Sequence, residues 1–274
     1  MRNFCIIRNS TKDPKDVVTK EIVAYLQKKG AVCTIADNDS DLDETAECIL
    51  VLGGDGTMLR AAKRAVGRQI PLIGINLGTL GYLAEIDRER LIPALDSLIL
   101  DEFTVESRMM LTGIIYHEGK PVYSDIALND ITISREGNPR VINFKNYVND
   151  LYLTDYQADA IIISTPTGST GYSLSAGGPI VSPTARLLLM TPLAPHTLNA
   201  RSIIFAANDR IKVKIGEGRV VQPEKARVDF DGSVGYQVVT GDEIVVTRSV
   251  SQTKIIKIKQ ESFLETLRRK LSDN

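Results

Sequence analysis

Three glycines surround one aspartate in LVLGGDGTMLRAA, residues 50–62, between an apolar run and a helix-like pattern. Gly53 and Gly54 allow backbone conformations closed to other residues and let a ligand approach the main chain. The helix expected after them presents free N–H groups and a positive dipole end, so the turn predicts an anion site. The spacing matches neither the P-loop nor the dinucleotide fingerprint. The alternative is a tight turn with only a structural role. The central carboxylate argues against this alternative, because buried aspartates are rare unless paired or functional.

Asp55 would repel a phosphate, so two other roles remain for it. It could accept a proton from an attacking hydroxyl, or it could hold a magnesium ion that neutralises phosphates. Both roles predict phosphoryl transfer, and the sequence does not separate them. Arg60 and Lys63 lie on the first turns of the expected helix, where they are candidate counter-charges for phosphate oxygens. The alternative is that both are solvated surface charges.

A second glycine-bearing turn, NLGTLGYL at residues 76–83, follows the next apolar run. Gly78 and Gly81 again allow a close approach to the backbone. Tyr82 is a candidate for stacking on a nucleotide base, with a core aromatic as the alternative.

A hydroxyl-rich stretch, ADAIIISTPTGSTGYSLSAGGPI, occupies residues 158–180. An apolar strand leads into serines, threonines and glycines, which we expect to form a long loop. Hydroxyls and free N–H groups at this density suit a polar ligand with ribose hydroxyls, amide edges and phosphates. A plain linker is the alternative, but long structureless loops are rare inside compact domains.

Bulk composition is that of an ordinary globular chain: 274 residues, 24% charged, with a net charge of −1. This balance gives no reason to expect a nucleic-acid or membrane partner. The N-terminal apolar run is too short for a signal peptide, and no stretch approaches the roughly 20 apolar residues of a membrane span. Cys5, Cys33 and Cys48 are widely spaced, form no CxxC pair, and predict reduced thiols rather than a metal site. We therefore expect a cytoplasmic protein.

The first hundred residues alternate apolar strand-like runs with helical patterns. Strands are expected at 3–9, 31–35, 48–52 and 71–76, and helices at 13–30, 57–67 and 87–102. Asp13 is a candidate cap, Pro14 suits a first helical position, and Gly30 ends the first helix. Pro93 either starts or kinks the third helix. This alternation predicts a Rossmann-like α/β domain with a parallel sheet.

From Phe103 the apolar residues alternate with a period of two, which predicts a β-rich domain. Hairpin turns are expected at 117–120 and 149–150, and further strands at 160–165, 201–207, 210–216, 226–233, 243–249 and 254–259. Residues 261–274 return to helical spacing, and we expect this helix to cross back to the first domain. The predicted domains are therefore 1–102 with 254–274, carrying GGDGT, and 103–253, the β-rich ligand-binding domain.

The ordered motifs of this chain resemble those of the NAD kinases. They are GGDGT at 53–57, NLGTLGYL at 76–83, LND at 128–130, STPTGSTGYSLSAGGPI at 164–180 and TPLAPHTLNARSI at 191–203. The resemblance runs from about Leu50 to Asp231. GGDGT alone also resembles turns of diacylglycerol kinases, sphingosine kinases and phosphofructokinases, whereas the hydroxyl-rich stretch is specific.

The resemblance implies phosphorylation of NAD at the 2′-hydroxyl of its adenosine ribose, with ATP as donor and a divalent metal, Mg²⁺, as cofactor. It implies that Asp55 is the catalytic residue, with metal binding as its other possible role. It also implies a homodimer or homotetramer, and the composition predicts no nucleic-acid or membrane partner. The choice among ATP, other triphosphates and polyphosphate stays open.

The resemblance and the residue patterns together give two sets of binding residues. The NAD-binding set is Gly56, Arg60, Tyr82, Asn129, Asp130, Arg140, Gln157, Asp159, Thr167, Thr170, Gly171, Tyr172, Ser173, Leu174 and Ser175. The set for the phosphate and donor turn is Gly53, Gly54, Thr57, Gly78 and Gly81.

Several residues depart from the family pattern. Asn129-Asp130 stands where the family has Asn-Glu, so the carboxylate is one methylene shorter. Ala158-Asp159-Ala160 replaces Gly-Asp-Gly, Gly171 replaces alanine, and Asp231-Gly232-Ser233 replaces Asp-Gly-Gln. Gln157 stands where some relatives have arginine, from which we expect that NADH is also accepted.

Two alternative functions remain at this point. One is a lipid or sugar kinase of the same broad fold, against which the stretch at 164–180 argues. The other is a non-catalytic dinucleotide sensor, against which the retained carboxylate of Asp55 argues.

Overall fold

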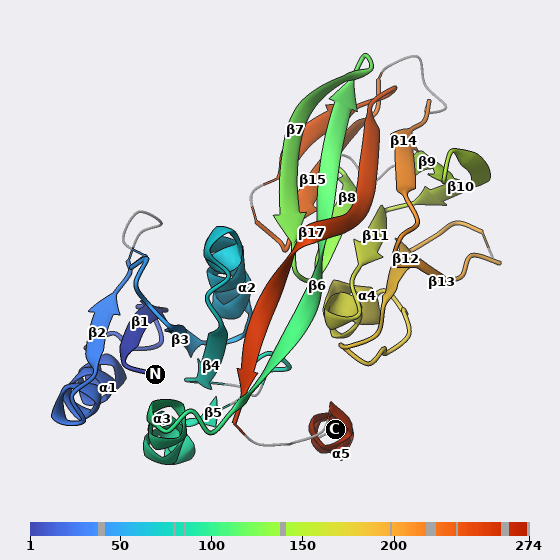
Figure 1. The fold of residues 1–274 in the computed structure, drawn as a ribbon. Helices are drawn as coiled ribbons and strands as arrows, with labels where there is room; N and C mark the ends of the chain where they lie inside the picture. The colour runs from blue at the N-terminus through green and yellow to red at the C-terminus, as the bar shows by residue number, and fades with distance from the viewer. Residues whose placement is uncertain are drawn as a thin grey trace. The chain divides into compact units, whose positions relative to one another are not determined.

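The computed structural model describes residues 1–37, 42–78, 81–84, 86–137, 141–197, 199–217, 223–233, 235–258 and 263–272. The chain forms two compact units, which Figure 1 shows as a ribbon. The first unit is Met1–Arg108 with Ser251–Asn274, and the second is Met109–Val250. Strands β6 (Thr104–His117) and β17 (Glu243–Lys257) each contribute residues to both units.

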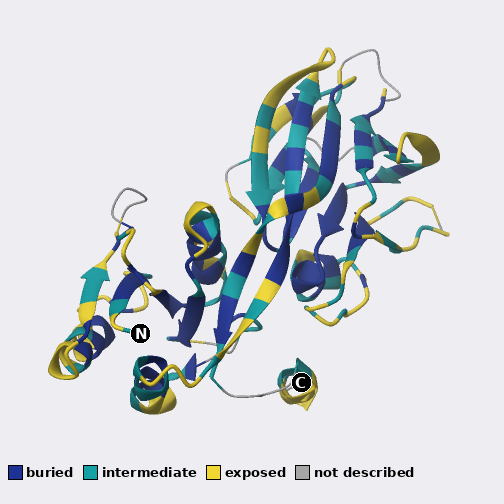
Figure 2. Ribbon diagram, in the orientation of Figure 1, coloured by how far each residue is buried: buried dark blue, intermediate teal, exposed yellow. Residues whose placement is uncertain are grey.

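A parallel sheet forms the centre of the first unit. Its order is β17–β4–β3–β1–β2, with β5 also paired to β4, and every described pairing among these strands is parallel. The strands are β1 (Asn3–Arg8), β2 (Val32–Ile35), β3 (Cys48–Gly53), β4 (Leu72–Asn76) and β5 (Ile86–Asp87). Figure 2 shows β3 and β4 buried along their length, as in the middle of a parallel sheet covered on both faces.

Helices connect these strands, which confirms the predicted α/β alternation. They are α1 (Val17–Lys28), α2 (Asp55–Ala65) with the 3-10 turn η2 (Val66–Arg68), and α3 (Leu91–Ile99) preceded by the 3-10 turn η3 (Arg88–Arg90). Pro93 lies in the first turn of α3, where its missing N–H costs no helical hydrogen bond.

The first helix begins later than predicted, at Val17 instead of Asp13. Asp13 nevertheless acts on the helix start, because its buried carboxylate accepts the backbone N–H groups of Val18 and Thr19 and the Thr19 hydroxyl. These bonds hold the pKa of Asp13 below its usual value although burial alone would raise it. The residues between Asp13 and Val17 form turns, with Asp16 in the left-handed region.

The second unit is built almost entirely of antiparallel strands. One sheet has the order β13–β12–β11–β8–β15–β16, and a second series pairs β10–β9–β14–β17, with β6 pairing β17 and β7. Besides β6 and β17, the strands are β7 (Lys120–Ala127), β8 (Asp130–Arg135), β9 (Ile142–Val148), β10 (Leu151–Ala158), β11 (Ala160–Ser164), β12 (Leu187–Leu193), β13 (Ile203–Ala206), β14 (Ile211–Ile215), β15 (Lys225–Phe230) and β16 (Tyr236–Val239). The predicted β-rich character is confirmed.

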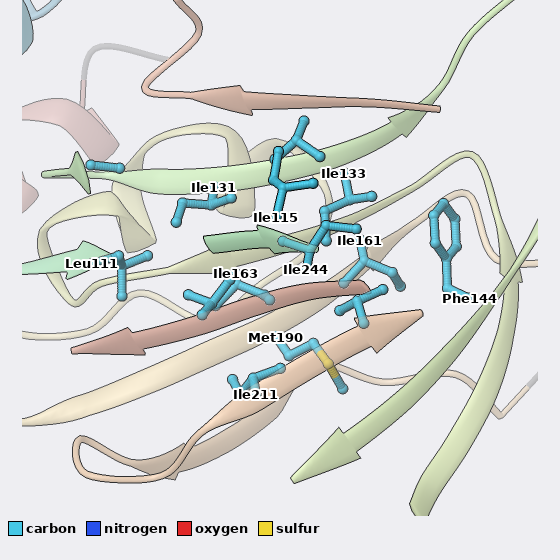
Figure 3. Packing of buried hydrophobic residues seen from close by; sticks show 14 of the residues in the cluster. Leu111, Ile115, Ile131, Ile133, Phe144, Ile161, Ile163, Met190, Ile211 and Ile244 are labelled. Atoms are coloured by element: carbon cyan, nitrogen blue, oxygen red, sulfur yellow. The ribbon is translucent and has the colours of Figure 1, made fainter. Parts of the chain in front are cut away.

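An aliphatic core fills the interior of this second unit. Figure 3 shows Ile133 of β8, Phe144 of β9 and Ile161 of β11 within it, and all three are buried. Along β9, buried residues alternate with half-buried ones, which is the period of two seen in the sequence.

Both predicted hairpin turns are confirmed. Glu118–Gly119 joins β6 to β7 and Asn149–Asp150 joins β9 to β10, and all four residues have positive φ angles. Two consecutive positive φ angles give the turn twist that matches paired strands.

Two expectations about the second half of the chain are wrong. The separate strands expected at 243–249 and 254–259 form one continuous strand, β17. Strand β12 was not expected, although LLLMTPL is strongly apolar.

The last helix, α5 (Phe263–Ser272), has no buried residue. Lys270 Nζ lies 4.8 Å from the centroid of the Tyr82 ring. The predicted return of this helix to the first unit stays a prediction. None of the described helices is long and apolar enough to cross a membrane.

All three cysteines are free thiols, and Cys5 and Cys48 are buried. Burial raises the pKa of Cys33 to about 12. Burial also raises the pKa of Cys48, so the Cys33 and Cys48 thiols are poor nucleophiles and poor metal ligands near neutral pH.

Candidate functional site

Asp55 is the first residue of α2 and follows the extended residue Gly54. Its carboxylate accepts the backbone N–H of Tyr82 at 2.9 Å through Oδ2 and that of Leu83 at 3.1 Å through Oδ1. The two glycine-bearing turns, predicted separately, therefore meet at this carboxylate. Strand register explains the meeting, because Gly53 at the end of β3 lies opposite Asn76 at the end of β4.

Close packing within the protein requires glycine at two of the predicted positions. A Cβ on Gly81 would lie 1.9 Å from Asp55 Oδ1, and a Cβ on Gly53 would lie 2.4 Å from Thr57 Oγ1. At Gly56, in contrast, a Cβ would meet no atom within 4 Å. Gly53 and Gly81 thus make room for neighbouring side chains, whereas the space beside Gly56 is open.

Lys12 lies beside both glycine turns, and sequence reasoning missed it. Its Nζ would be 3.3 Å from a Cβ on Gly54 and 2.8 Å from a Cβ on Gly78. Lys12 is exposed, and none of the hydrogen bonds or ion pairs among the described residues involves its ammonium group. The available signal was its position just after β1, because the carboxyl ends of neighbouring parallel strands share one edge of the sheet.

Hydrogen bonds fix the loops that carry these groups. Asn9 accepts the Lys12 backbone N–H at 3.0 Å through its carbonyl oxygen and the Thr11 backbone N–H at 3.0 Å through its side chain. The Asn76 side chain makes two hydrogen bonds to Gly78 in the second turn. Its Nδ2 donates to the Gly78 carbonyl at 3.0 Å, and its Oδ1 accepts the Gly78 N–H at 3.0 Å. Hydrogen bonds with Asn9 and Asn76 therefore fix the backbone around Lys12 and Gly78.

The predicted counter-charges on α2 lie further along the same helix. Arg60 Nη2 donates to Thr57 Oγ1 at 3.5 Å, so its guanidinium lies beside the first turn. Lys63 is half-buried. Tyr82 is half-buried, and the Lys270 ammonium lies near its ring. The contact of Tyr82 with Asp55 is made by its backbone N–H and not by its ring.

In the second unit, the predicted pair Asn129-Asp130 lies at the start of β8. The Asp231 carboxylate accepts the backbone N–H groups of Leu128, Asn129 and Asp130 at 2.8, 2.7 and 3.2 Å. Asp130 is only 6% exposed, and burial, followed by the nearby charge of Asp231, raises its pKa to about 7. This carboxyl group therefore titrates near neutrality.

The hydroxyl-rich stretch is not the irregular loop that we expected. It forms a 3-10 turn, η4 (Thr167–Thr170), and a short helix, α4 (Tyr172–Ser175). Ser169 and Ser173 are fully buried: the Ser169 hydroxyl donates to the Val181 carbonyl at 3.3 Å, and Ser173 Oγ lies 3.1 Å from Thr191 Oγ1. Many of the hydroxyls thus hold the segment together, which composition alone does not reveal.

Other predicted residues of this stretch stay accessible. Tyr172 is 44% exposed and Ser175 is exposed. Thr170, Gly171 and Leu174 are half-buried, and Thr167 is buried. A ligand can therefore reach Tyr172 and Ser175 without any rearrangement of the segment.

The segment packs directly on Asn129. A Cβ on Gly168 would lie 2.0 Å from the Asn129 carbonyl oxygen, which also accepts the Thr165 N–H at 2.8 Å. A Cβ on Gly171 would lie 3.2 Å from Asn129 Nδ2, and the Tyr172 N–H donates to Asp130. The structure thus brings together Asn129, Asp130 and residues 168–172, which the sequence separates.

The oxygen atoms Asn129 Oδ1, Ser164 Oγ and Thr167 Oγ1 are buried without a hydrogen-bond partner among the described atoms. Buried polar atoms of this kind are uncommon in folded proteins. They mark the contact between Asn129 and the hydroxyl-rich segment as a place where polar groups are incompletely satisfied.

The remaining predicted residues lie elsewhere on the second unit. Asp159, between β10 and β11, binds Arg135 Nε through Oδ1 at 2.7 Å, so its carboxylate already has a cationic partner. Gln157 is half-buried, and its carbonyl accepts the His196 N–H at 2.8 Å. Arg140 lies outside the described residues.

A divalent metal has no complete protein site here, since no three His, Cys, Asp or Glu side chains among the described residues are grouped to hold one. Mg²⁺ is often held by one or two carboxylates together with substrate phosphates and waters. Each Asp55 oxygen accepts one N–H and keeps a further lone pair. Asp55 therefore fits a metal that phosphates help to bind.

Comparison with known families gives two matches that together cover most of the chain. Residues 6–103 match the ATP-NAD kinase N-terminal domain, and residues 128–258 match the ATP-NAD kinase C-terminal domain.

Curated proteins with similar sequences are named NAD kinase. The chain is 44% identical to the NAD kinase of Lachnospira eligens, over 99% of this chain and 100% of that protein. It is 43% identical to the NAD kinase of Agathobacter rectalis, over 100% of this chain and 99% of that protein.

Two solved structures share the fold. Yeast NADH kinase complexed with NADH superposes with a TM-score of 0.89 at 24% identity, covering 100% of this chain and 88% of that one. An NAD kinase from Archaeoglobus fulgidus in complex with ATP gives a TM-score of 0.80 at 23% identity, covering 99% of each chain.

Proposed function

Because the chain belongs to the ATP-NAD kinase family, we propose that it phosphorylates the 2′-hydroxyl of the adenosine ribose of NAD, using ATP. The single observation that carries the catalytic assignment is the position of Asp55. Its carboxylate lies at the N-terminus of α2 and is oriented by two backbone N–H groups of the neighbouring turn.

Asp55 acts as the general base in this proposal. The ribose 2′-oxygen attacks the γ-phosphorus of ATP, and the hydroxyl proton passes to Asp55. The bond between that phosphorus and the β,γ-bridging oxygen breaks, and ADP leaves with the bonding electrons. Catalysis of this transfer depends mainly on positioning and charge neutralisation.

Phosphate groups are held by the N-terminal N–H groups of α2 and by the two glycine turns. Lys12 supports this role because its ammonium lies beside Gly54 and Gly78. A helix N-terminus favours anions through its free N–H groups and dipole, and an adjacent ammonium strengthens that preference. A divalent metal, Mg²⁺ in our proposal, would neutralise phosphate charge and would be held by Asp55 together with the substrate phosphates.

The adenosine part of NAD is bound in this proposal by residues of the second unit. Asn129, Asp130 and the exposed residues Tyr172 and Ser175 support this assignment because they lie on adjoining segments. The other members of the predicted NAD-binding set keep their proposed roles. Asp159 acts there as an Arg135-bound carboxylate.

From the composition and the family we also propose that the protein is cytoplasmic and forms a homodimer or homotetramer. We also propose that residues 1–102 with 254–274 form the domain of Asp55, and that 103–253 form the NAD-binding domain.

The test is NADP formation by the full-length protein with ATP, NAD and Mg²⁺, comparing the wild type with Asp55→Asn. We expect turnover to fall by about a hundredfold or more, because general base catalysis contributes roughly 10²–10⁴-fold. NAD binding, measured by calorimetry, should persist. Glu21→Gln, which neutralises an exposed acid on α1, is the matched control and should keep full activity.

Two results would overturn the proposal. Undetectable NADP formation by the wild type, with lipid phosphorylation in a parallel assay, would favour the lipid kinase alternative. Tight NAD binding without turnover, unaffected by Asp55→Asn, would favour a sensor.

A further inference from the structure

Asp231 is the first residue after β15, which pairs with β8 in the second unit (Figure 1). The register places Phe230 opposite Ile131, and the Asp231 N–H extends the pairing by donating to the Asp130 carbonyl at 3.0 Å. Its φ angle of 53° lies in the left-handed region, which aspartate adopts more readily than most residues. Strand pairing therefore brings Asp231 to the start of β8, which lies 101 positions earlier in the chain.

The Asp231 carboxylate binds three consecutive backbone N–H groups. Its Oδ1 accepts those of Asn129 and Asp130 at 2.7 and 3.2 Å, and its Oδ2 accepts that of Leu128 at 2.8 Å. Successive N–H groups that converge in this way form a concave site for an anion. Hydrogen bonds to an ionised acceptor are stronger than neutral ones. One side chain therefore fixes the backbone of residues 128–130.

This stretch of backbone carries two side chains of the predicted NAD-binding set. A Cβ on Gly171 would lie 3.2 Å from Asn129 Nδ2 and 3.6 Å from Asp130 Oδ2. The Tyr172 N–H also donates to the Asp130 carboxylate. Because these approaches are close, any movement of the backbone at 128–130 shifts both side chains relative to Gly171 and Tyr172.

Strand pairing does not depend on the Asp231 carboxylate. The backbone of β8 is already held on both sides, by β11 along residues 130–134 and by β15 along residues 131–135. The carboxylate also has an electrostatic cost, since its charge adds to burial in raising the pKa of Asp130 to about 7. A structural role alone gives no reason to place two carboxyl groups together, and such pairs occur more often at functional sites.

We propose that Asp231 is a positioning residue of the NAD site: its carboxylate holds the backbone of residues 128–130, and thereby the side chains of Asn129 and Asp130, in place for NAD. The inference rests on the proposed function and deepens it. Asp231 acts through these two side chains and is assigned no contact of its own with NAD. Its loss should therefore weaken the binding of NAD and spare that of ATP.

The test compares variants of the full-length protein. In Asp231→Asn, whichever way the amide is turned, its NH₂ group faces at least one of the three backbone N–H groups, so a donor meets a donor. Asp231→Glu is a second variant, which keeps the charge but displaces the carboxylate by one methylene. Asp242→Asn is the matched control, because the buried Asp242 carboxylate also accepts a backbone N–H, that of Val239 at 2.9 Å, and pairs with His117.

Each protein is melted, titrated separately with NAD and with ATP by calorimetry, and assayed for its KM values in NADP formation. Both Asp231 variants should bind NAD about tenfold more weakly and show a KM for NAD raised by about as much, the effect of losing one charge-assisted contact. Their affinity for ATP should stay at the wild-type value. Asp242→Asn should lower the melting temperature, because it removes a buried hydrogen-bonded charge, yet bind NAD as the wild type does.

Three outcomes overturn the proposal: unchanged NAD affinity in both Asp231 variants, equal weakening of NAD and ATP binding, or equal weakening of NAD binding by Asp242→Asn. The same measurements separate this failure from failure of the proposed function. If NADP forms and the Asp231 variants keep the wild-type KM for NAD, the function stands and the positioning role fails. If the wild type binds NAD without forming NADP, and the Asp231 variants weaken that binding, the positioning role stands and the catalytic function fails.

Discussion

Replacing Gly81 by alanine should displace the Asp55 carboxylate, the general base of the proposed mechanism. The new Cβ would lie 1.9 Å from Asp55 Oδ1 and 2.5 Å from Asp55 Cγ, which is far inside van der Waals contact. The Asp55 side chain is short, so it can avoid the methyl group only by rotating away or by pushing the second turn outward. Either response breaks the hydrogen bonds from the Tyr82 and Leu83 N–H groups.

The expected effects on stability and turnover differ in size. Hydrogen bonds to a charged group contribute about 1.5–3 kcal/mol each, and a half-buried carboxylate recovers part of that from water. We therefore expect about 2–4 kcal/mol less stability and a melting temperature lower by roughly 5–10 °C. Turnover should fall by about a hundredfold or more, because a misplacement of about 1 Å has that effect on catalysis.

Gly56→Ala is the matched control for stability. A Cβ there meets no atom within 4 Å, and alanine is the better helix former by about 1 kcal/mol. Its melting temperature should equal or exceed that of the wild type. Melting is followed by circular dichroism, and turnover by coupled NADP formation. If Gly81→Ala melts and turns over like the wild type, the contact between Asp55 and the second turn has no part in the active protein.

Three further predictions concern other residues. Lys12→Gln should raise the KM for ATP by roughly tenfold with little change in melting temperature, because it removes an exposed ammonium beside both glycine turns. An unchanged KM would show that Lys12 does not bind phosphate. Burial raises the pKa of Asp130 to about 7, so folding takes up a proton and the unfolding free energy falls as pH rises from about 4 to 7. Asp130→Asn should flatten that slope in melting curves at pH 5 and pH 8, and an equal slope in both proteins would contradict this. NADH should be phosphorylated at a measurable rate. Gln157→Arg should raise the turnover with NADH relative to that with NAD several-fold, because an arginine repels the positively charged oxidised nicotinamide at a separation of a few ångströms. Undetectable NADH turnover in both proteins would contradict both statements.

Patterns of apolar residues were sufficient to predict the fold class. The runs at β3 and β4 are apolar throughout because both faces of a parallel sheet are covered. The period of two in the second half follows from strands with one buried face. Hairpin turns were predictable because Glu118-Gly119 and Asn149-Asp150 interrupt that alternation.

Element boundaries were less predictable where side chains bond over several residues. Asp13 caps α1 from four residues before its first helical position, so a capping residue alone did not locate the start. The segment 164–180 has the composition of a loop, yet it forms a 3-10 turn and a short helix, and its buried hydroxyls at Ser169 and Ser173 contact Val181 and Thr191 outside the segment. Composition does not distinguish hydroxyls that face a ligand from those that face the chain.

Contacts within the site depend on which strands become neighbours. Asp55 and the amides of Tyr82 and Leu83 meet because β3 and β4 are paired with their ends level. The same argument applies to Lys12, since β1 pairs with β3 and both end at the same edge. Each glycine turn was recognisable alone, but strand order was needed to bring the two turns and Lys12 together.

The proposed phosphate site at this turn must tolerate the carboxylate of Asp55. Asp55 begins α2, where its charge would by itself oppose a phosphate at the helix N-terminus. Its two oxygens are bonded to N–H groups of the second turn, which fixes their orientation, and the Lys12 ammonium beside Gly54 and Gly78 offsets the charge. The carboxylate is thereby restrained for proton transfer or metal binding while the amides of α2 stay available to phosphate. Under the proposed function, this division of roles allows an acid and a phosphate site to share one turn.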